Sequence, residues 1–307
     1  MDELVYHFID DNELLELINS DSSYTMNDES IMEEKEDWFN SIERVCESRC
    51  ITFWDTSKIT TMEDMFIQEK QFNELLLWNT KNVTNMSYMF YGAGSFNHPL
   101  EFNTDKVDNM CGMFYGASSF DKPLKFTTNN VVNMSYMFYG ASSFNQPLEF
   151  NTDKVDNMSF MFYDTVSFNH PLEFNTENVT DMAGMFQIAC SFNQPLEFNT
   201  ENVTNMAGMF DRAISFNQPL EFNTENVTDM GSMFYRATSF NQPLKFNTKN
   251  VVNMYCMFDD ARSFNHPVTF NTENVVNMSY MFAGTSLFNQ PLEFNTENVT
   301  NMAGMFD

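Results

Sequence analysis

The stretch Ser191-Phe-Asn-Gln-Pro-Leu-Glu-Phe-Asn-Thr-Glu-Asn-Val-Thr-Asn-Met-Ala-Gly-Met-Phe210 decides the fold, because its pattern returns every 24 residues along most of the chain. The phenylalanine that closes each unit recurs without insertion at Phe66, Phe90, Phe114, Phe138, Phe162, Phe186, Phe210, Phe234, Phe258, Phe282 and Phe306. Such a period is typical of solenoids, which enlarge their core by stacking like units. The sequence therefore predicts an array of about eleven repeats over residues 49–307.

Each unit combines two apolar patterns. Val203, Met206, Met209, Phe210 and Ala213 form the stripe of a short helix that is buried on one side. Asn202, just before this stripe, is a plausible N-cap for that helix.

The second pattern follows a proline. Leu220, Glu221 and Phe222 alternate apolar and polar as a strand does, and all nine prolines occupy the slot of Pro219, where a strand can start. The residue after the phenylalanine is asparagine in nine of ten units, with Thr127 the exception, so a stacked asparagine ladder could satisfy the turn.

One short strand and one short helix in 24 residues predict an α/β repeat solenoid that resembles leucine-rich-repeat horseshoes. In the alternative, a β-solenoid, the valine-to-phenylalanine segment is extended. The helical form is preferred because, with a period of two, Val203 and Met206 would face opposite sides.

Residues 1–48 do not match the repeat and are interpreted as an acidic helical N-terminal cap. Apolar residues from Leu4 to Ile18 are spaced like one or two short helices, and a further helix is expected from Ser30 to Val45, with Ser30 and Glu33 as a capping box. Residues 1–60 carry 16 acidic and 4 basic side chains. Whether this segment only covers the first repeat or also recruits a partner stays open.

Charge narrows the classes of partner and compartment. Fifteen Lys and Arg against 43 Asp and Glu give a net charge of -28, which repels phosphate backbones and anionic lipid, so we expect no nucleic-acid binding. The acidic start lacks the features of a secretory signal, and no apolar run reaches the length of a membrane span. Five cysteines without a common repeat position argue against a disulfide framework. The sequence therefore predicts a cytoplasmic protein without membrane insertion.

Units such as Asn82 to Leu100, which read Asn-Val-Thr-Asn-Met-Ser-x-Met-Phe-x-Gly-Ala-x-Ser-Phe-Asn-x-Pro-Leu, resemble the repeats of BspA-like leucine-rich-repeat surface proteins, including mycoplasma-type lipoproteins. The likeness covers about residues 51–307. The Phe-Asn-x-Pro-Leu portion is also similar, more weakly, to FNIP repeats. The resemblance implies a horseshoe-like fold and an adhesive role at a cell or particle surface.

Residues that could carry chemistry have simpler structural interpretations. Paired methionines such as Met182 and Met185 could bind Cu(I), but they lie on the stripe that must be buried. His98 and His170 are three repeats apart, too far to share one Zn²⁺, and His266 occupies the same slot. Cys46 with Cys50, and Asp105 with Asp108, are weak metal signals. The Asn-Val-Thr sequons are attributed to helix starts; they begin at Asn82, Asn178, Asn202, Asn226 and Asn298. We expect no enzyme activity, metal or cofactor.

The informative row is the residue between the leucine and phenylalanine of each unit. Along the array it reads Leu77, Glu101, Lys125, Glu149, Glu173, Glu197, Glu221, Lys245, Thr269 and Glu293. If the apolar neighbours point inward, this row points outward, on the concave binding face of a horseshoe. It could simply be a solvated acidic face. The functional alternative is a non-enzymatic scaffold that binds a protein with a basic surface, and adhesion of the BspA-like type is the second hypothesis.

Overall fold

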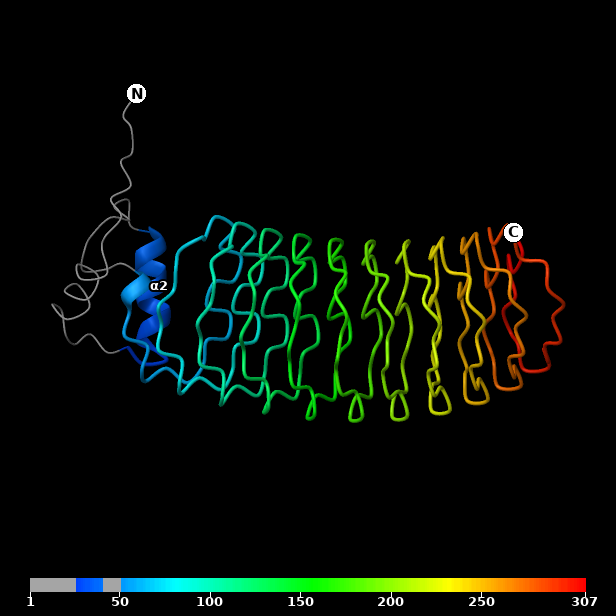
Figure 1. Cartoon of the computed structure of the whole chain (residues 1–307), viewed down its shortest axis with the longest axis horizontal. Helices are drawn as coiled ribbons and strands as arrows, with labels where there is room; N and C mark the ends of the chain where they lie inside the picture. The colour runs from blue at the N-terminus through cyan, green and yellow to red at the C-terminus, as the bar shows by residue number, and fades with distance from the viewer. Residues whose placement is uncertain (1–25, 41–50) are drawn as a thin grey trace, which may run out of the picture.

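The computed structural model describes residues 26–40 and 51–307, in which the chain forms a solenoid of stacked coils (Figure 1). Its named elements in this part are helix α2, Ser30–Asn40, and a short 3-10 helix η1, Ile51–Phe53. Helix α2 lies at one end of the stack, and the C-terminus lies at the other (Figure 1). A single hydrophobic core runs the whole length, from Met26 to Met305. The predicted repeat array is confirmed.

Neighbouring coils are joined at one bridging residue each. The bridges are parallel and always link residues 24 positions apart, as in Asn205 to Asp229. The bridging residues are Thr61, Asn85, Asn109, Asn133, Asn157, Asp181, Asn205, Asp229, Asn253, Asn277 and Asn301. Each bridge is isolated, so residues 51–307 contain no continuous strand.

The helix predicted over 203–213 is wrong, because three overlapping tight turns replace it. Within the coil, Met209, Asp211 and Ala213 donate their N–H groups three residues back, to Met206, Gly208 and Phe210. The alternate N–H groups cross to the next coil, as Met206 donates to Asp229 at 3.0 Å and Gly208 to Gly231 at 2.8 Å. The apolar stripe is buried as predicted, but its donors serve the neighbouring coil instead of an α-helical ladder.

These turns need a left-handed backbone at two positions of each coil. In this unit they are Gly208, with φ 62°, and Arg212, with φ 57°. A side chain in that region costs about 1–2 kcal/mol, yet thirteen non-glycine residues adopt it. The coil-to-coil hydrogen bonds offset this local cost, since only the alternating backbone directs the N–H groups outward.

The strand predicted at Leu220–Phe222 keeps its alternation but not its pairing. Leu220, Phe222 and Thr224 are buried, while Glu221 and Asn223 are exposed. The link to the next coil is a side-chain bond, in which the Thr224 hydroxyl donates to the Asn247 carbonyl at 3.0 Å. The β-solenoid alternative also fails as stated, because neither segment forms a strand in the described part of the chain.

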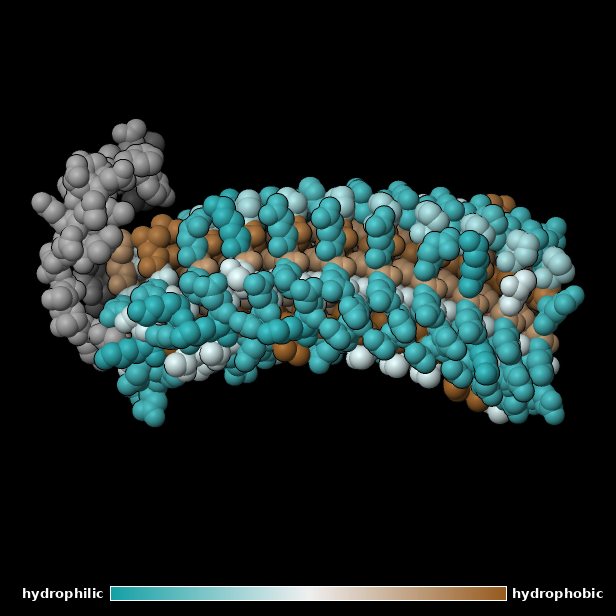
Figure 2. All heavy atoms as spheres, turned by 60° about the horizontal axis from the view of Figure 1, so that its bottom comes forward, coloured by the Kyte–Doolittle hydropathy of each residue, from teal (hydrophilic) through white to brown (hydrophobic). Residues whose placement is uncertain are grey.

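The spacing between coils explains why the leucine-to-threonine stretch lacks backbone pairing. The array as a whole bends (Figure 2). Equivalent rings are 4.0 Å apart at Tyr139 and Tyr163 on the turn side, but 6.1 Å apart at Trp54 and Trp78 in the leucine-to-threonine stretch. Paired strands need about 4.8 Å. The concave position expected for the binding row stays a prediction.

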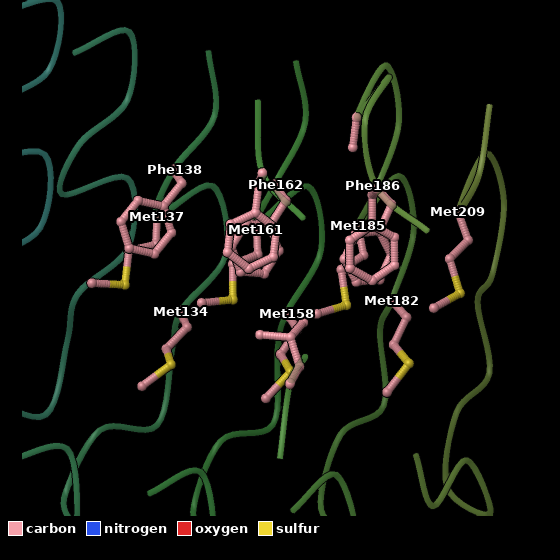
Figure 3. Packing of buried hydrophobic residues seen from close by; sticks show 14 of the residues in the cluster. Met134, Met137, Phe138, Met158, Met161, Phe162, Met182, Met185, Phe186 and Met209 are labelled. Carbon is pink, nitrogen blue, oxygen red and sulfur yellow. The ribbon is translucent and has the colours of Figure 1, made fainter. Parts of the chain in front are cut away.

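The interior is filled by rows of methionine and phenylalanine. Figure 3 shows Met134, Met158 and Met182 in one such row, each from a successive coil. Phe138 is fully buried, and its ring stacks on Phe162 of the next coil at 5.6 Å. The methionine pairs are therefore core side chains, as expected, except for Met302 in the last coil, which is 44% exposed.

Helix α2 and the residues just before it cover the first coil, where Ile31 of the helix and Met26 ahead of it are buried in the core. Its cap is Asn27, which accepts the Ser30 N–H at 2.9 Å while Ser30 Oγ accepts the Asn27 N–H. The capping box predicted at Ser30 and Glu33 therefore lies three residues earlier. Asp28 joins the helix to the array by accepting the Thr60 N–H at 2.8 Å and the Thr60 hydroxyl at 2.6 Å. The helices expected in residues 1–25 and the end of the one expected to reach Val45 lie outside the described residues.

Candidate interaction surfaces

The row predicted from the sequence is exposed in every coil from Leu77 to Glu293. Two of its lysines pair with the preceding glutamate: Lys125 with Glu101 at 3.7 Å, and Lys245 with Glu221 at 3.3 Å. These side chains are 71–78% exposed, so each pair contributes little to stability. Between the lysines lie Glu149, Glu173 and Glu197, which form no ion pair with any residue in 26–40 or 51–307.

A second acidic row lies beside the first and was missed by the sequence reasoning. The alternation of buried and exposed residues continues three residues beyond the phenylalanine, through an exposed asparagine and a buried threonine, so Asp153 is exposed as Glu149 is. We define the acidic face as Glu149, Asp153, Glu173, Glu177, Glu197, Glu201, Glu221 and Glu225. All eight are exposed. The missed signal was the alternation of Leu-Glu-Phe-Asn-Thr-Glu, which covers six residues instead of three.

Lysines bound the acidic face at both ends. Lys125 precedes it, and Lys245 and Lys249 occupy both rows in the coil that follows it. The face thus has a defined length of four coils, while Glu101 and Glu293 of the predicted row lie beyond its limits. Figure 2 shows hydrophilic side chains in rows along the array, with hydrophobic residues visible between them.

The turn side carries a second kind of surface, a stack of tyrosines. Tyr91, Tyr115, Tyr139 and Tyr163 lie in successive coils with ring centroids 4.7, 4.2 and 4.0 Å apart. The same position holds Gln187 and Asp211 in the next two coils. Where the stack stops, a shallow hollow of about 650 Å³ opens; it is lined by small side chains and glycines, among them Gly208 and Gly231.

Asp211 is the buried acid of this hollow, with 5% of its surface exposed. Its carboxylate accepts hydrogen bonds from the Gln187 amide and from Arg212 Nε, the latter at 2.9 Å. Burial raises the pKa of Asp211, and the hydrogen bonds from Arg212 and Gln187 offset only part of that rise. This site was not predictable from the sequence, because small residues at one repeat position resemble the variation found at other positions of the repeat.

The histidines that could carry chemistry instead contact the neighbouring coil. Nε2 of His98 lies 3.1 Å from the carbonyl oxygen of Asn73 in the preceding coil, and Gln194 reaches Asn169 in the same way. His170 and His266 repeat this contact. Cys111, Cys190 and Cys256 are free thiols, and Cys46 and Cys50 lie outside the described residues. In the described ranges, no three His, Cys, Asp or Glu side chains converge on a metal position, around Asp105 and Asp108 or elsewhere.

Two asparagine ladders link the coils. The Nδ2 of Asn202, a sequon asparagine, donates to the Glu177 carbonyl at 2.8 Å, so the helix-start interpretation of the sequons is wrong. The Oδ1 of Asn193 accepts the backbone N–H of Asn217 at 2.9 Å. The asparagine expected to form a ladder, at the position of Asn223, instead closes a local turn by accepting the Glu225 N–H at 3.0 Å.

In residues 26–40 and 51–307, no helix has the length and apolar character needed to cross a membrane.

Comparison with known proteins identifies the repeats. No curated protein and no solved structure shows significant similarity to the chain. The family described as "Mycoplasma protein of unknown function, DUF285" matches five overlapping stretches, at residues 34–149, 100–196, 124–220, 172–269 and 220–307. These matches extend over all but the first 33 residues, and the chain therefore belongs to this mycoplasma-type repeat family.

Proposed function

We propose that the chain is a non-enzymatic scaffold that binds a protein with a basic surface through the acidic face. The observation that carries the proposal is the arrangement of eight exposed carboxylates in two rows, of which the first ends at Lys125 and Lys245 and the second ends at Lys249. A solvated face without a binding role has no need of defined ends. Lysines at the limits disfavour binding of a basic partner beyond four coils, and so could fix the register of the complex.

The geometry supports binding by many weak contacts. Equivalent positions recur once per 24-residue coil, so each row carries one carboxylate in each of four successive coils. Such rows raise the local concentration of cations and steer a basic partner toward the face. Glu149, Glu173 and Glu197 are the central contacts, because no lysine in the described residues neutralises them.

The test compares two triple variants with equal loss of charge. Glu149→Gln, Glu173→Gln and Glu197→Gln neutralise the acidic face, whereas Glu273→Gln, Glu293→Gln and Glu297→Gln neutralise exposed acids of the same two rows beyond Lys249. Tagged full-length proteins are incubated with cell lysate, and the captured proteins are quantified at several salt concentrations. We expect the first variant to lose the basic proteins that the wild type captures, with a smaller salt dependence. Equal capture by both variants would refute the proposal.

The resemblance to BspA-like surface proteins supports a second candidate, adhesion at a cell or particle surface, in place of the cytoplasmic scaffold. Both candidates can use the acidic face, so location distinguishes them. Treating intact cells with protease decides between them: cleavage of the array with a cytoplasmic control protein intact indicates surface display, and protection of the array indicates the scaffold.

A further inference from the structure

The turn side places an aromatic ring over glycine in three separate coils. A Cβ atom built on Gly112 would lie 2.3 Å from the ring of Tyr88, which shows that this ring lies directly over the glycine. Phe160 covers Gly184 in the same way, with a separation of 2.4 Å, and Tyr280 covers Gly304. In each case the ring comes from the equivalent position of the preceding coil, 24 residues earlier. The turn backbone and its glycine therefore form a seat for an aromatic ring.

Gly208 has the same seat without a ring. Its φ of 62° matches the 58° of Gly112 and Gly184 and the 60° of Gly304, so the backbone is equivalent. The preceding coil has glycine, Gly184, where the others have tyrosine or phenylalanine, and it can supply no ring. A Cβ built on Gly208 would meet no atom closer than 3.7 Å.

The open seat lies within the hollow of about 650 Å³. Aromatic residues border that hollow on both sides: Phe160 from an earlier coil, and Tyr255, which is 42% exposed, from a later one. Edge-to-face and stacked contacts with such rings favour an aromatic guest.

The charged residues near the open seat indicate which chemical group lies beside the bound aromatic ring in the ligand. Ten coils from Asn85 onward bridge through asparagine or aspartate, and the two aspartates, Asp181 and Asp229, bracket the coil of Gly208. Asp181 and the buried Asp211 line the hollow, where Arg212 pairs with Asp211. The surroundings of the seat thus favour a positively charged neighbour on the ligand.

We infer that the hollow over Gly208 binds an aromatic side chain of a peptide segment in a partner protein, with Lys or Arg beside it. The internal seats carry this assignment, because three rings of this chain occupy the equivalent place. A sugar ring would also find aromatic and amide groups here, and the test below distinguishes the two ligands. The site is separate from the acidic face and does not depend on that face binding a partner.

The sharpest variant fills the seat region from within. Gly208→Tyr gives the chain a ring of its own in the hollow, at a backbone angle that Tyr88, Tyr136 and Tyr280 already adopt with φ between 52° and 59°. Gly140→Tyr is the matched control, since Gly140 also has positive φ, at 66°, and its Cβ would meet nothing closer than 3.6 Å, outside the hollow. Tyr255→Ala removes one aromatic border at an exposed position and serves as a second test if Gly208→Tyr unfolds.

The probe is a random linear peptide library displayed on phage and selected on the full-length protein, followed by synthesis of the enriched peptides. We expect enrichment of Phe, Tyr or Trp beside Lys or Arg. The peptides should bind about tenfold or more weakly to Gly208→Tyr and to Tyr255→Ala, and unchanged to Gly140→Tyr. Replacing the aromatic residue of the peptide by Leu should cause a similar loss.

Three results would overturn the inference: no aromatic enrichment, equal binding to Gly208→Tyr and the wild type, or insensitivity to the Leu replacement in the peptide. A glycan array is probed in parallel with the same proteins. Glycan binding that disappears in Gly208→Tyr, without aromatic peptide binding, would assign the hollow to carbohydrate and refute the peptide assignment. Because these variants leave Glu149, Glu173 and Glu197 intact, failure here is distinguishable from failure of the acidic face.

Discussion

The tyrosine stack from Tyr91 to Tyr163 and the hollow around Gly208 occupy the same side of the array. Both are built on the same turns, the same bridges and the same buried methionine and phenylalanine rows. They differ because tyrosine gives way to Gln187 and Asp211 at one position, and an aromatic residue gives way to glycine at another. The comparison teaches that the scaffold is uniform and that its surfaces are set by a few side chains in each coil.

The largest expected effect is the loss of stability on removing a buried phenylalanine ring, and it should be equal beneath the tyrosine stack and beneath the hollow. Phe138 lies under the stack and Phe210 under the hollow; both are fully buried, with neighbouring rings at 4.2 and 4.1 Å respectively. Replacing either with Ala should lower the free energy of unfolding by about 3–5 kcal/mol, because a ring-sized cavity is left. Urea denaturation of each variant measures this. Values that differ by more than about 1 kcal/mol would show that the interior is not uniform.

An intermediate loss of stability is expected when a glycine covered by a ring is replaced with alanine, and a smaller loss when the glycine is not covered. Gly184→Ala places a Cβ 2.4 Å from the Phe160 ring, whereas Gly208→Ala finds no atom within 3.7 Å. Both variants incur about 1 kcal/mol for a left-handed alanine, and only the first must also displace a ring, for about 2–4 kcal/mol in total. Thermal unfolding compares the two. If they are equally destabilised, Phe160 does not lie over Gly184 in solution.

The smallest effect concerns the acid that replaces tyrosine in the hollow. Because burial raises the pKa of Asp211 in the folded chain, the folded state holds its proton more tightly than the unfolded state. As pH rises from the ordinary value of 3.8 through the raised pKa, Asp211 lowers the free energy of unfolding, and this loss persists above that window. Asp211→Asn abolishes this dependence.

The difference between Asp211→Asn and wild type should therefore shift in favour of the variant with increasing pH. Below pH 3.8 the two should agree within about 1 kcal/mol, since both side chains are neutral and can keep the hydrogen bond from Gln187. Urea titrations at a series of pH values follow the difference. A constant difference across the window would contradict a raised pKa for Asp211.

The repeat, its phase and its buried residues were predictable from the sequence. The stripe of Val203, Met206, Met209 and Phe210 is buried, and so are Leu220 and Phe222. An unbroken 24-residue period fixes which positions face inward, because every coil meets its neighbours with the same side chains.

The conformation of the coil was not predictable by the same reasoning. Apolar residues at i, i+3, i+6 and i+7 suit a helix, but a run of tight turns also places them inward. The deciding interaction, in which alternate N–H groups bind the next coil, involves no side chain. Residues such as Gly208 and Asn205, poor helix formers, were the available sign that a helix would not form.

The acidic row was predictable and the hollow was not. An exposed row follows from alternation alone, which is why the exposure of Glu149 and its equivalents could be predicted from the sequence. The hollow depends on which ring of one coil covers the next, as Phe160 covers Gly184. That relation between coils appears only when the side-chain directions are known.

The hydrogen bonds between coils, such as Gly208 to Gly231, have a mechanical consequence. They link residues about one repeat apart, so tension applied at the two ends loads every interface in series, like the links of a chain. The weakest interface then yields first, and one released coil of 24 residues adds roughly 80 Å of extended length. A scaffold built in this way can lengthen stepwise under load while the remaining coils keep their binding surfaces.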